Sequence, residues 1–243
     1  MDNVLVTGGT GFLGRRLSLV KPVWTYLSSK DCDLTKSDQV AQLYGDHNPD
    51  AVLHLAARVG GIKDNIENQA DFFHINTMMN TNVIHEAHKA NINRVLSTLS
   101  TCAFPERLEY FPFTEEDFFL GAPTEMLHVA SCAYRTQYGR NYSTFCPSNI
   151  YGPNDHFGSE ASHFVAALVN KLYDANDGET INLWGTGLPL RQQLYVDDLC
   201  RIIPLLLEKH DTETPLIVAP RENLTILEMT KTLIEQTGKS VRA

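Results

Sequence analysis

A glycine-rich stretch near the N-terminus has the composition and spacing of a phosphate-binding turn. Its residues are Gly8-Gly9-Thr10-Gly11-Phe12-Leu13-Gly14, and they follow the apolar run Val4-Leu5-Val6. Gly8 permits a tight turn, Gly11 lets the backbone approach a pyrophosphate, and Gly14 allows a helix to pack closely on a strand. A helix that begins here presents free N–H groups and its positive dipole end to phosphate oxygens. Glycines also serve ordinary turns, but the preceding strand and the T-G-x-x-G-x-x-G spacing favour a dinucleotide site.

The end of the second predicted strand discriminates between NAD and NADP. An acidic residue there would bind the ribose 2′-hydroxyl of NAD and repel a 2′-phosphate. This chain has Ser29 and Lys30 instead. A hydroxyl and an ammonium group suit a 2′-phosphate, so the sequence favours NADP(H), although the lysine can also be read as a solvated residue after a strand. After the second strand, Asp33 and Leu34 are expected at the adenine. Leu55, Ala56 and Ala57 end the next strand, where small residues leave room for the dinucleotide or only pack the strand end.

Short apolar runs alternate with helical patterns through the first half of the chain. Such runs are typical of parallel strands that are buried on both faces. The predicted strands are Asn3–Val6, Val23–Leu27, Ala51–Leu55, Arg94–Leu99 and Ser143–Cys146. The predicted helices are Gly11–Val20, Ser37–Tyr44, Asn76–Ala90 and Met126–Tyr138. This order predicts an α/β fold with a doubly wound parallel sheet.

The second half of the chain is more mixed. We expect helices over His163–Asp174 and Asp197–Glu208, a short strand over Thr180–Trp184, and a helix that begins at the capping box of Thr225 and Glu228. Residues 1–146 are predicted to form the nucleotide-binding domain, completed by a segment that returns near residues 189–200. Residues 147–243 are predicted to form mainly a smaller, mixed α/β substrate domain.

Composition excludes several classes of protein. Apolar residues make up 43% of the chain and charged residues 20%, which is enough to bury a core. The formal net charge of −9 argues against nucleic-acid binding, which usually needs a basic face. Five cysteines without a C-x-x-C pair favour neither a disulfide framework nor a metal site, and they suit a reducing cytoplasm. We expect no signal peptide and no membrane span, because no run of about 18 apolar residues occurs.

Several segments spread over nearly the whole chain resemble one family. The resemblance is to the GDP-L-fucose synthases, which are NADP-dependent epimerase/reductases of the extended short-chain dehydrogenase class with a Rossmann sheet. The Val-Gly-Gly-Ile and Ser-Thr-Cys pieces discriminate best, whereas Asn-Ile-Tyr-Gly-Pro is shared more widely among nucleotide-sugar enzymes. The matching segments run from Leu55 to Ile62, Leu99 to Pro105, Pro147 to Phe157, Ser162 to His163, Trp184 to Gly187 and Tyr195 to Leu199.

The resemblance implies a reaction on GDP-4-keto-6-deoxy-D-mannose. C3 and C5 are inverted, and NADPH then reduces the C4 ketone to give GDP-L-fucose. Protons beside the ketone are acidic, so a base on one face and an acid on the other are required, each with a pKa near the working pH. By resemblance Cys102 is the base, His163 the acid, and Ser100 a hydrogen-bond donor to the C4 oxygen. Taken singly, such a cysteine is more often a small buried side chain, and such a histidine a structural hydrogen-bonding group.

The resemblance also implies further binding residues. For the diphosphate of the substrate, Lys171 and Arg191 provide positive charge, and Trp184 offers a flat apolar face. Lys171 can also be read as an exposed helix charge, and Trp184 as a core residue. A homodimer is implied, formed through the helices predicted at Asn76–Ala90 and Met126–Tyr138. The remaining residues that the resemblance places at the cofactor are Leu99, Pro147, Asn149, Ile150 and His163, of which Asn149 also faces the substrate or serves only the following turn.

One departure from the family pattern affects the predicted reduction. The class uses a Tyr-x-x-x-Lys pair on a helix to donate a proton to the ketone, but Glu125 here runs directly into Met126 and no pair is present. The match from Tyr26 to Lys30 lies on a predicted strand, so its side chains do not share a helical turn. Either the printed sequence lacks a segment, in which case the intact mass exceeds 27.2 kDa, or the deletion is real. Two other functions therefore stay open: another nucleotide-sugar epimerase or dehydratase, and an inactive NADP-binding regulator.

Overall fold

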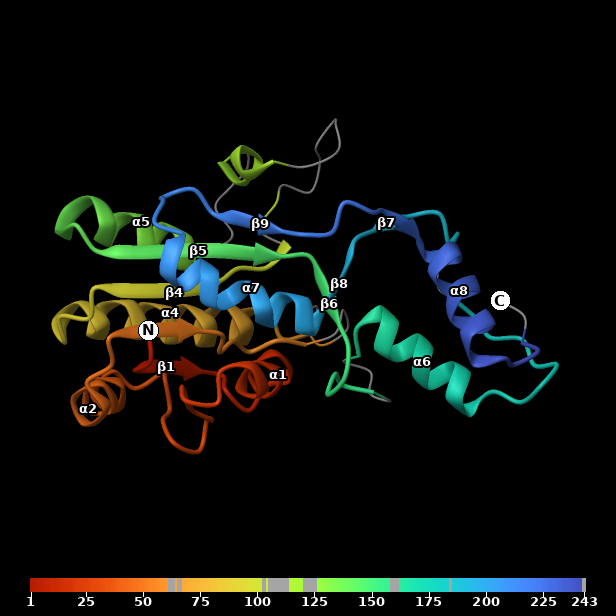
Figure 1. The fold of residues 1–243 in the computed structure, drawn as a ribbon, viewed down its shortest axis with the longest axis horizontal. Coiled ribbons are helices and arrows are strands. Elements are labelled where there is room, and N and C mark those ends of the chain that lie inside the picture. Colours follow the sequence, from red (N-terminus) through yellow and green to blue (C-terminus); the bar gives the residue numbers. More distant parts are fainter. Residues whose placement is uncertain are drawn as a thin grey trace.

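A parallel sheet forms the centre of the larger of two lobes, as a computed structural model shows (Figure 1). The structure describes residues 1–60, 64, 67–101, 104, 114–119, 126–157, 162–183 and 185–241. Within these residues six strands pair in the order β2-β1-β3-β4-β5-β9, with every pair parallel. The strands are β1 (Val4–Thr7), β2 (Thr25–Tyr26), β3 (Ala51–His54), β4 (Arg94–Thr98), β5 (Asn141–Pro147) and β9 (Leu216–Val218). The predicted doubly wound parallel sheet is confirmed, and its direction of winding reverses beside β1.

Helices cover both faces of this sheet. One layer contains α1 (Phe12–Val20) and α7 (Val196–Lys209), and the other contains α2 (Ser37–His47), α4 (Gln69–Lys89) and α5 (Met126–Tyr138). Successive strand residues face opposite layers. Leu5 packs in the core beneath α2, α4 and α5, whereas Val4 and Val6 pack with α1 and α7. Double-sided burial therefore explains the continuous apolar runs of the strands.

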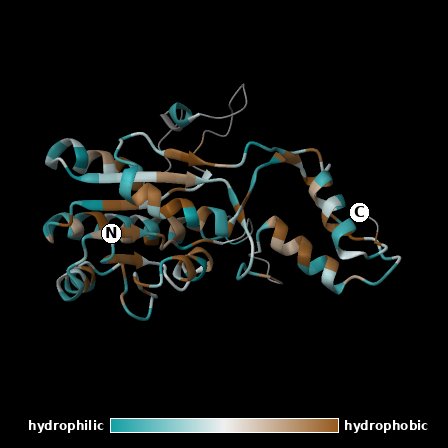
Figure 2. Cartoon of the chain, viewed as in Figure 1, coloured by the Kyte–Doolittle hydropathy of each residue, from teal (hydrophilic) through white to brown (hydrophobic). Residues whose placement is uncertain are grey.

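A smaller lobe follows the sheet. Its helices α6 (Phe164–Asp174) and α8 (Ile226–Thr237) are joined by a core of their own, in which Leu168 and Leu172 of α6 meet Leu233 and Ile234 of α8. Figure 2 shows that most of α6 is hydrophobic, and Ala166, Leu168 and Leu172 are its buried residues. The predicted capping box is present, because Thr225 and Glu228 exchange hydrogen bonds at the start of α8. The remaining elements are β6 (Asn149–Tyr151), β7 (Leu190–Arg191), β8 (Gln193–Tyr195), β10 (Leu224–Thr225) and the short 3₁₀ helix η2 (Glu115–Phe119).

Three elements differ from the sequence-based expectations. The second strand is reduced to Thr25–Tyr26, because a turn from Lys21 to Trp24 occupies the residues before it. Helix α4 begins at Gln69 and not at residue 76. The strand predicted over Thr180–Trp184 is not formed by its described residues, 180–183. Thr180 makes an isolated bridge, and residues 181–183 join no strand.

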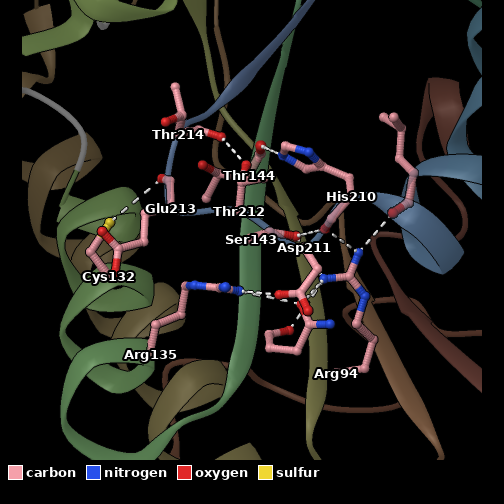
Figure 3. A network of polar contacts seen from close by, with 12 residues as sticks. Arg94, Cys132, Arg135, Ser143, Thr144, His210, Asp211, Thr212, Glu213 and Thr214 are labelled. Carbon is pink, nitrogen blue, oxygen red and sulfur yellow. Dashed lines mark hydrogen bonds and ion pairs between the residues drawn. The ribbon is translucent and has the colours of Figure 1, made fainter.

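The chain returns to the large sheet after β8, and a buried arginine holds that return in place (Figure 3). Arg94, at the start of β4, donates from Nε and Nη2 to the carbonyl oxygens of Leu207, Leu206 and His210 at 2.7, 2.7 and 2.9 Å. Its Nη1 donates to Ser143 of β5 at 2.7 Å. Burial lowers the pKa of Arg94 to about 10, so the side chain stays charged at neutral pH. A cation here satisfies the last carbonyl groups of α7.

Candidate active site

The glycine-rich turn joins β1 to α1 and lies against the segment that follows β3. Gly8 has a φ of 71°, and a Cβ atom there would lie 2.8 Å from the backbone nitrogen of Ala56. A Cβ atom at Gly14 would lie 2.5 Å from the carbonyl oxygen of Gly9. The N–H of Gly9 donates to the carbonyl of Leu27 at 2.7 Å, which ties the turn to the end of β2. Packing alone therefore requires glycine at positions 8 and 14.

Gly11 has a different environment. It is the N-cap of α1, it is exposed, and a Cβ atom there would approach only the carbonyl oxygen of Gly8, at 3.1 Å, among the described residues. Protein packing leaves this face of the turn open, beside the free N–H groups of the first turn of α1. An open glycine face at a helix N-terminus fits the pyrophosphate of a dinucleotide.

A buried chain of hydrogen bonds supports the ends of β1 and β3. His54 Nδ1 lies 2.7 Å from Thr7 Oγ1, and His54 Nε2 lies 3.0 Å from Asn80 Oδ1. Burial lowers the pKa of His54 to about 4, so the ring is neutral. Because a carboxamide oxygen only accepts, Nε2 carries the hydrogen and Nδ1 accepts from Thr7. This chain fixes both strand ends to α4.

Asn76 of α4 holds the segment after β3. Its side chain accepts from the N–H of Arg58 at 2.8 Å and donates to the carbonyl of the same residue at 3.0 Å. Sequence reasoning missed both Asn76 and Asn80. Their only sequence signal is a pair of asparagines one helical turn apart on a helix that faces the strand ends.

The residues after β2 form an exposed turn. The Asp31 carboxylate accepts from the N–H of Ser28 at 2.7 Å and from its hydroxyl at 2.6 Å, and Ser29 and Lys30 are exposed at the tip. Asp33 accepts from the N–H of Thr35 at 3.0 Å, so its carboxylate shapes the next turn. The following residue, Leu34, is buried.

Further predicted residues follow the carboxyl ends of β4 and β5. Ser100 is exposed two residues beyond β4, and the N–H of Leu99 donates to the carbonyl of Phe145 at 2.7 Å. Pro147 ends β5, and Asn149, which is exposed, begins β6 with Ile150 next to it. Because these strands are parallel, the ends of β1, β3, β4 and β5 share one edge of the sheet. Cys102 lies outside the described residues.

His163 is the N-cap residue of α6, and a buried carboxylate faces it. Its Nδ1 lies 3.6 Å from Asp155 Oδ1, with the imidazole 65% exposed and the Asp155 side chain 1% exposed. The Asp155 carboxylate raises the pKa of His163, while partial desolvation of the ring acts in the opposite direction. Asp155 belongs to the quoted segment from Pro147 to Phe157, but sequence reasoning gave it no role.

The predicted diphosphate-binding residues lie on separate elements of the smaller lobe. Lys171, in the last turn of α6, is exposed and donates to the carbonyl of Asn182 at 2.8 Å. Arg191 is exposed on β7 and donates to the carbonyl of Leu190 at 2.8 Å. Trp184 lies outside the part of the chain that the structure describes. No contact between the described Lys171 and Arg191 side chains joins them into one site.

Among the described residues no group of three or more histidine, cysteine, aspartate or glutamate side chains has an arrangement suited to a metal ion. No described helix is both long enough and apolar enough to cross a membrane.

The fold and the turn define a class of nucleotide-dependent enzyme. The chain belongs to the NAD dependent epimerase/dehydratase family, whose model matches residues 4–219. Its relatives include a probable GDP-L-fucose synthase of Drosophila melanogaster, 33% identical over 94% of this chain and 79% of that protein. The GDP-L-fucose synthase of Dictyostelium discoideum is 32% identical over 96% and 78%.

Solved structures agree with the sequence relatives. A GDP-L-fucose synthetase from Naegleria fowleri bound to NADP has a TM-score of 0.87 and 30% identity, and the match covers 99% of this chain and 79% of that one. A GDP-D-glycero-L-gluco-heptose synthase from Campylobacter jejuni, at 20% identity and a TM-score of 0.89, shows the same fold. The resemblance to the GDP-L-fucose synthases is therefore confirmed.

Proposed function

We propose that this protein is an NADPH-dependent GDP-L-fucose synthase that acts on GDP-4-keto-6-deoxy-D-mannose. The observation that carries the proposal is the gathering of the glycine turn, the segment from Leu55 to Ala57 and Ser100 at one edge of the sheet. The sequence relatives named above support the same substrate. The proposed localisation is the cytoplasm.

NADPH, when bound, supplies the hydride that reduces the C4 ketone. The glycine turn and the N-terminus of α1 hold its pyrophosphate, and the open face of Gly11 fits a close approach. Ser29 and Lys30 bind the 2′-phosphate. The other residues proposed to line the cofactor are Asp33, Leu34, Leu55, Ala56, Ala57, Leu99, Pro147, Asn149, Ile150 and His163.

The epimerase half of the reaction needs a base and an acid. Cys102 as a thiolate removes a proton beside the ketone, and Ser100 donates a hydrogen bond to the C4 oxygen as negative charge develops. His163 returns a proton to the opposite face of the carbon. The neighbouring Asp155 carboxylate raises the pKa of His163, and a raised pKa favours the protonated ring that an acid requires.

The smaller lobe, within residues 147–243, is proposed to bind the GDP moiety. Lys171 and Arg191 neutralise the diphosphate, Trp184 contacts an apolar face of the nucleotide, and Asn149 contacts the sugar. The protein is proposed to form a homodimer through α4 and α5. On that surface Tyr138 is 48% exposed and stacks on His88 with ring centroids 4.1 Å apart.

Two measurements on one sample test the proposal. Incorporation of solvent deuterium at C3 and C5 reports epimerisation, and loss of NADPH absorbance reports reduction. We expect both with GDP-4-keto-6-deoxy-D-mannose. Deuterium incorporation without NADPH oxidation would show that the missing Tyr-x-x-x-Lys pair disables only the reduction. Tight NADP binding without either reaction would refute the proposed enzymatic activity and favour the inactive NADP-binding regulator.

A further inference from the structure

Asp155 is a buried carboxylate that lacks full hydrogen bonding. Its side chain is 1% exposed. Oδ1 accepts from the N–H of His156 at 2.7 Å, whereas Oδ2 is buried and has no hydrogen-bond partner among the described residues. A buried carboxylate costs free energy unless a positive charge or several donors compensate it. The compensating group must therefore lie close by.

The described surroundings of Asp155 provide one ion-pair partner, His163 at 3.6 Å. The rings of Tyr151 on β6 and Tyr195 on β8 are tilted against each other, with centroids 5.5 Å apart, and burial raises the pKa of Tyr151. At the start of α7, Asp197 forms an ion pair with Arg16, and Asp198 forms one with Arg201. His156 contributes its backbone N–H.

The local backbone explains why the carboxylate is buried beneath α6. Gly152 and Asn154 have φ values of 146° and 72°, and the N–H of Asp155 donates to the carbonyl of Gly152 at 3.3 Å. This turn places Asp155 beside a cavity of about 180 Å³ that is otherwise lined with tyrosine and apolar residues, including Val165 and Val169 of α6. Low polarity around the carboxylate strengthens its attraction for a nearby cation.

We propose that Asp155 is a positioning residue that holds His163 as the imidazolium ion and reserves its Nε2 for the substrate. The proposal rests on the proposed function of His163 as the acid. Because Nδ1 faces the carboxylate, Nε2 is the ring nitrogen that remains for proton transfer. The distance of 3.6 Å is that of an ion pair and exceeds a direct hydrogen bond.

In the proposed step a proton moves from His163 Nε2 to the enolate carbon of the substrate. The Nε2–H bond breaks as the electron pair of the enolate forms a C–H bond on the substrate, and the C4 carbonyl is restored. The imidazole becomes neutral, and Asp155 keeps its charge throughout. Water then returns a proton to the ring, which is 65% exposed.

The direct test is a titration of the His163 ring by NMR in protein labelled at histidine Cε1, with His163→Gln used for assignment. In the wild type we expect titration above the ordinary value of about 6.5. Asp155→Asn should lower it by about 0.5 to 1 pH unit, at the low end for a carboxylate neighbour because the ring is exposed. The matched control is Asp211→Asn, which removes a carboxylate 2.7 Å from Arg135 and should leave the titration unchanged. Equal titration of His163 in the wild type and in Asp155→Asn would overturn the proposal.

Kinetics separate positioning from a merely structural role. In Asp155→Asn the alkaline decline in the rate of deuterium incorporation should begin at a lower pH, and kcat should be about 5-fold lower at pH 7.5. Asp155→Glu should restore part of that rate. If Asp155 only supports α6, the variant unfolds at a lower temperature while the profile keeps its position, and the proposal fails.

Two further controls keep the test decisive. If Asp155→Asn does not fold, the wild type decides: the His163 titration should move down toward about 6.5 as salt is added, and a titration at or below that value would overturn the proposal. The titrations need no substrate. Full deuterium incorporation by His163→Gln would therefore refute the role of His163 as the acid. The ion pair between His163 and Asp155, as measured by the titrations, would still stand.

Discussion

Alanine substitutions at Gly14 and Gly11 should have opposite consequences, although both residues belong to one turn. At Gly14 a Cβ atom would lie 2.5 Å from the carbonyl oxygen of Gly9 and 2.6 Å from that of Gly8. Both contacts are to backbone, which cannot rotate away. Overpacking costs about 1–3 kcal/mol, and the helix preference of alanine returns about 1 kcal/mol. Because two backbone atoms are involved, we expect a net loss of about 2 kcal/mol, or roughly 4–8 °C in Tm for a chain of this size.

At Gly11 the new methyl group meets only the carbonyl oxygen of Gly8, at 3.1 Å. The backbone angles, φ −73° and ψ 179°, suit alanine. A weaker N-cap costs about 0.5–1 kcal/mol, and a less flexible unfolded chain offsets about 0.4–1 kcal/mol of it. We therefore expect Tm to stay within about 2 °C of the wild type. The methyl group occupies the face proposed for the pyrophosphate, so the Kd for NADP should rise at least about 10-fold.

Thermal unfolding by circular dichroism without cofactor, followed by calorimetric titration with NADP, measures both effects. Gly45→Ala is the matched control, because Gly45 lies in α2 with open space around it and should gain about 0.5–1 kcal/mol from helix preference. Two results would refute the reasoning. One is a Gly11→Ala protein whose Tm is as low as that of Gly14→Ala. The other is a Gly11→Ala protein that binds NADP with the same Kd as the wild type.

Four further predictions concern separate residues. Arg94→Lys keeps the charge but loses the planar fork that reaches the carbonyls of α7, so the free energy of unfolding should fall by about 2–4 kcal/mol, with a lower urea midpoint at unchanged m. The pKa of His54 is lowered to about 4, so between about pH 6.5 and 4 the unfolded chain binds a proton that the folded chain does not. The free energy of unfolding should therefore fall by up to about 3 kcal/mol as the pH falls through that window, and His54→Gln should remove this part of the pH dependence. Thr225→Ala should cost about 1 kcal/mol and speed amide exchange in the first turn of α8, whereas a slower exchange would contradict the capping box. Lys30→Glu should weaken NADP at least about 10-fold relative to NAD, as compared by their Kd values, and an unchanged ratio would exclude Lys30 from the 2′-phosphate site.

The sheet was predictable because its strands bury both faces. Residues such as Val52 and Leu53 point to opposite helical layers, and both must be apolar. The first turns of α4 were not predictable, because Phe73 is 66% exposed and breaks the amphipathic pattern. Ile181 and Leu183 alternate as in a strand, but their side chains pack on the core between α6 and α8 and the backbone joins no strand.

The candidate site was predictable to the extent that parallel strands end at one edge. This rule alone brings Gly8 against Ala56. The supporting residues were hidden for a physical reason. An aspartate is normally solvated, and only the left-handed turn at Asn154 and the packing of α6 bury Asp155 beside His163. Asn76 likewise gains its role from a loop distant in sequence, which no local pattern records.

The return of α7 and β9 to the large sheet has a consequence for synthesis on the ribosome. Strand β5 ends at Pro147, but the strand that covers its edge ends at Val218, and the helix that covers α1 lies between them. At ~5–20 residues per second, the nascent chain waits roughly 4 to 14 s with β5 as an open edge and with Leu17 and Phe145 uncovered by α7. During that interval the emerging chain presents the kind of exposed strand that chaperones bind and that other chains can pair with.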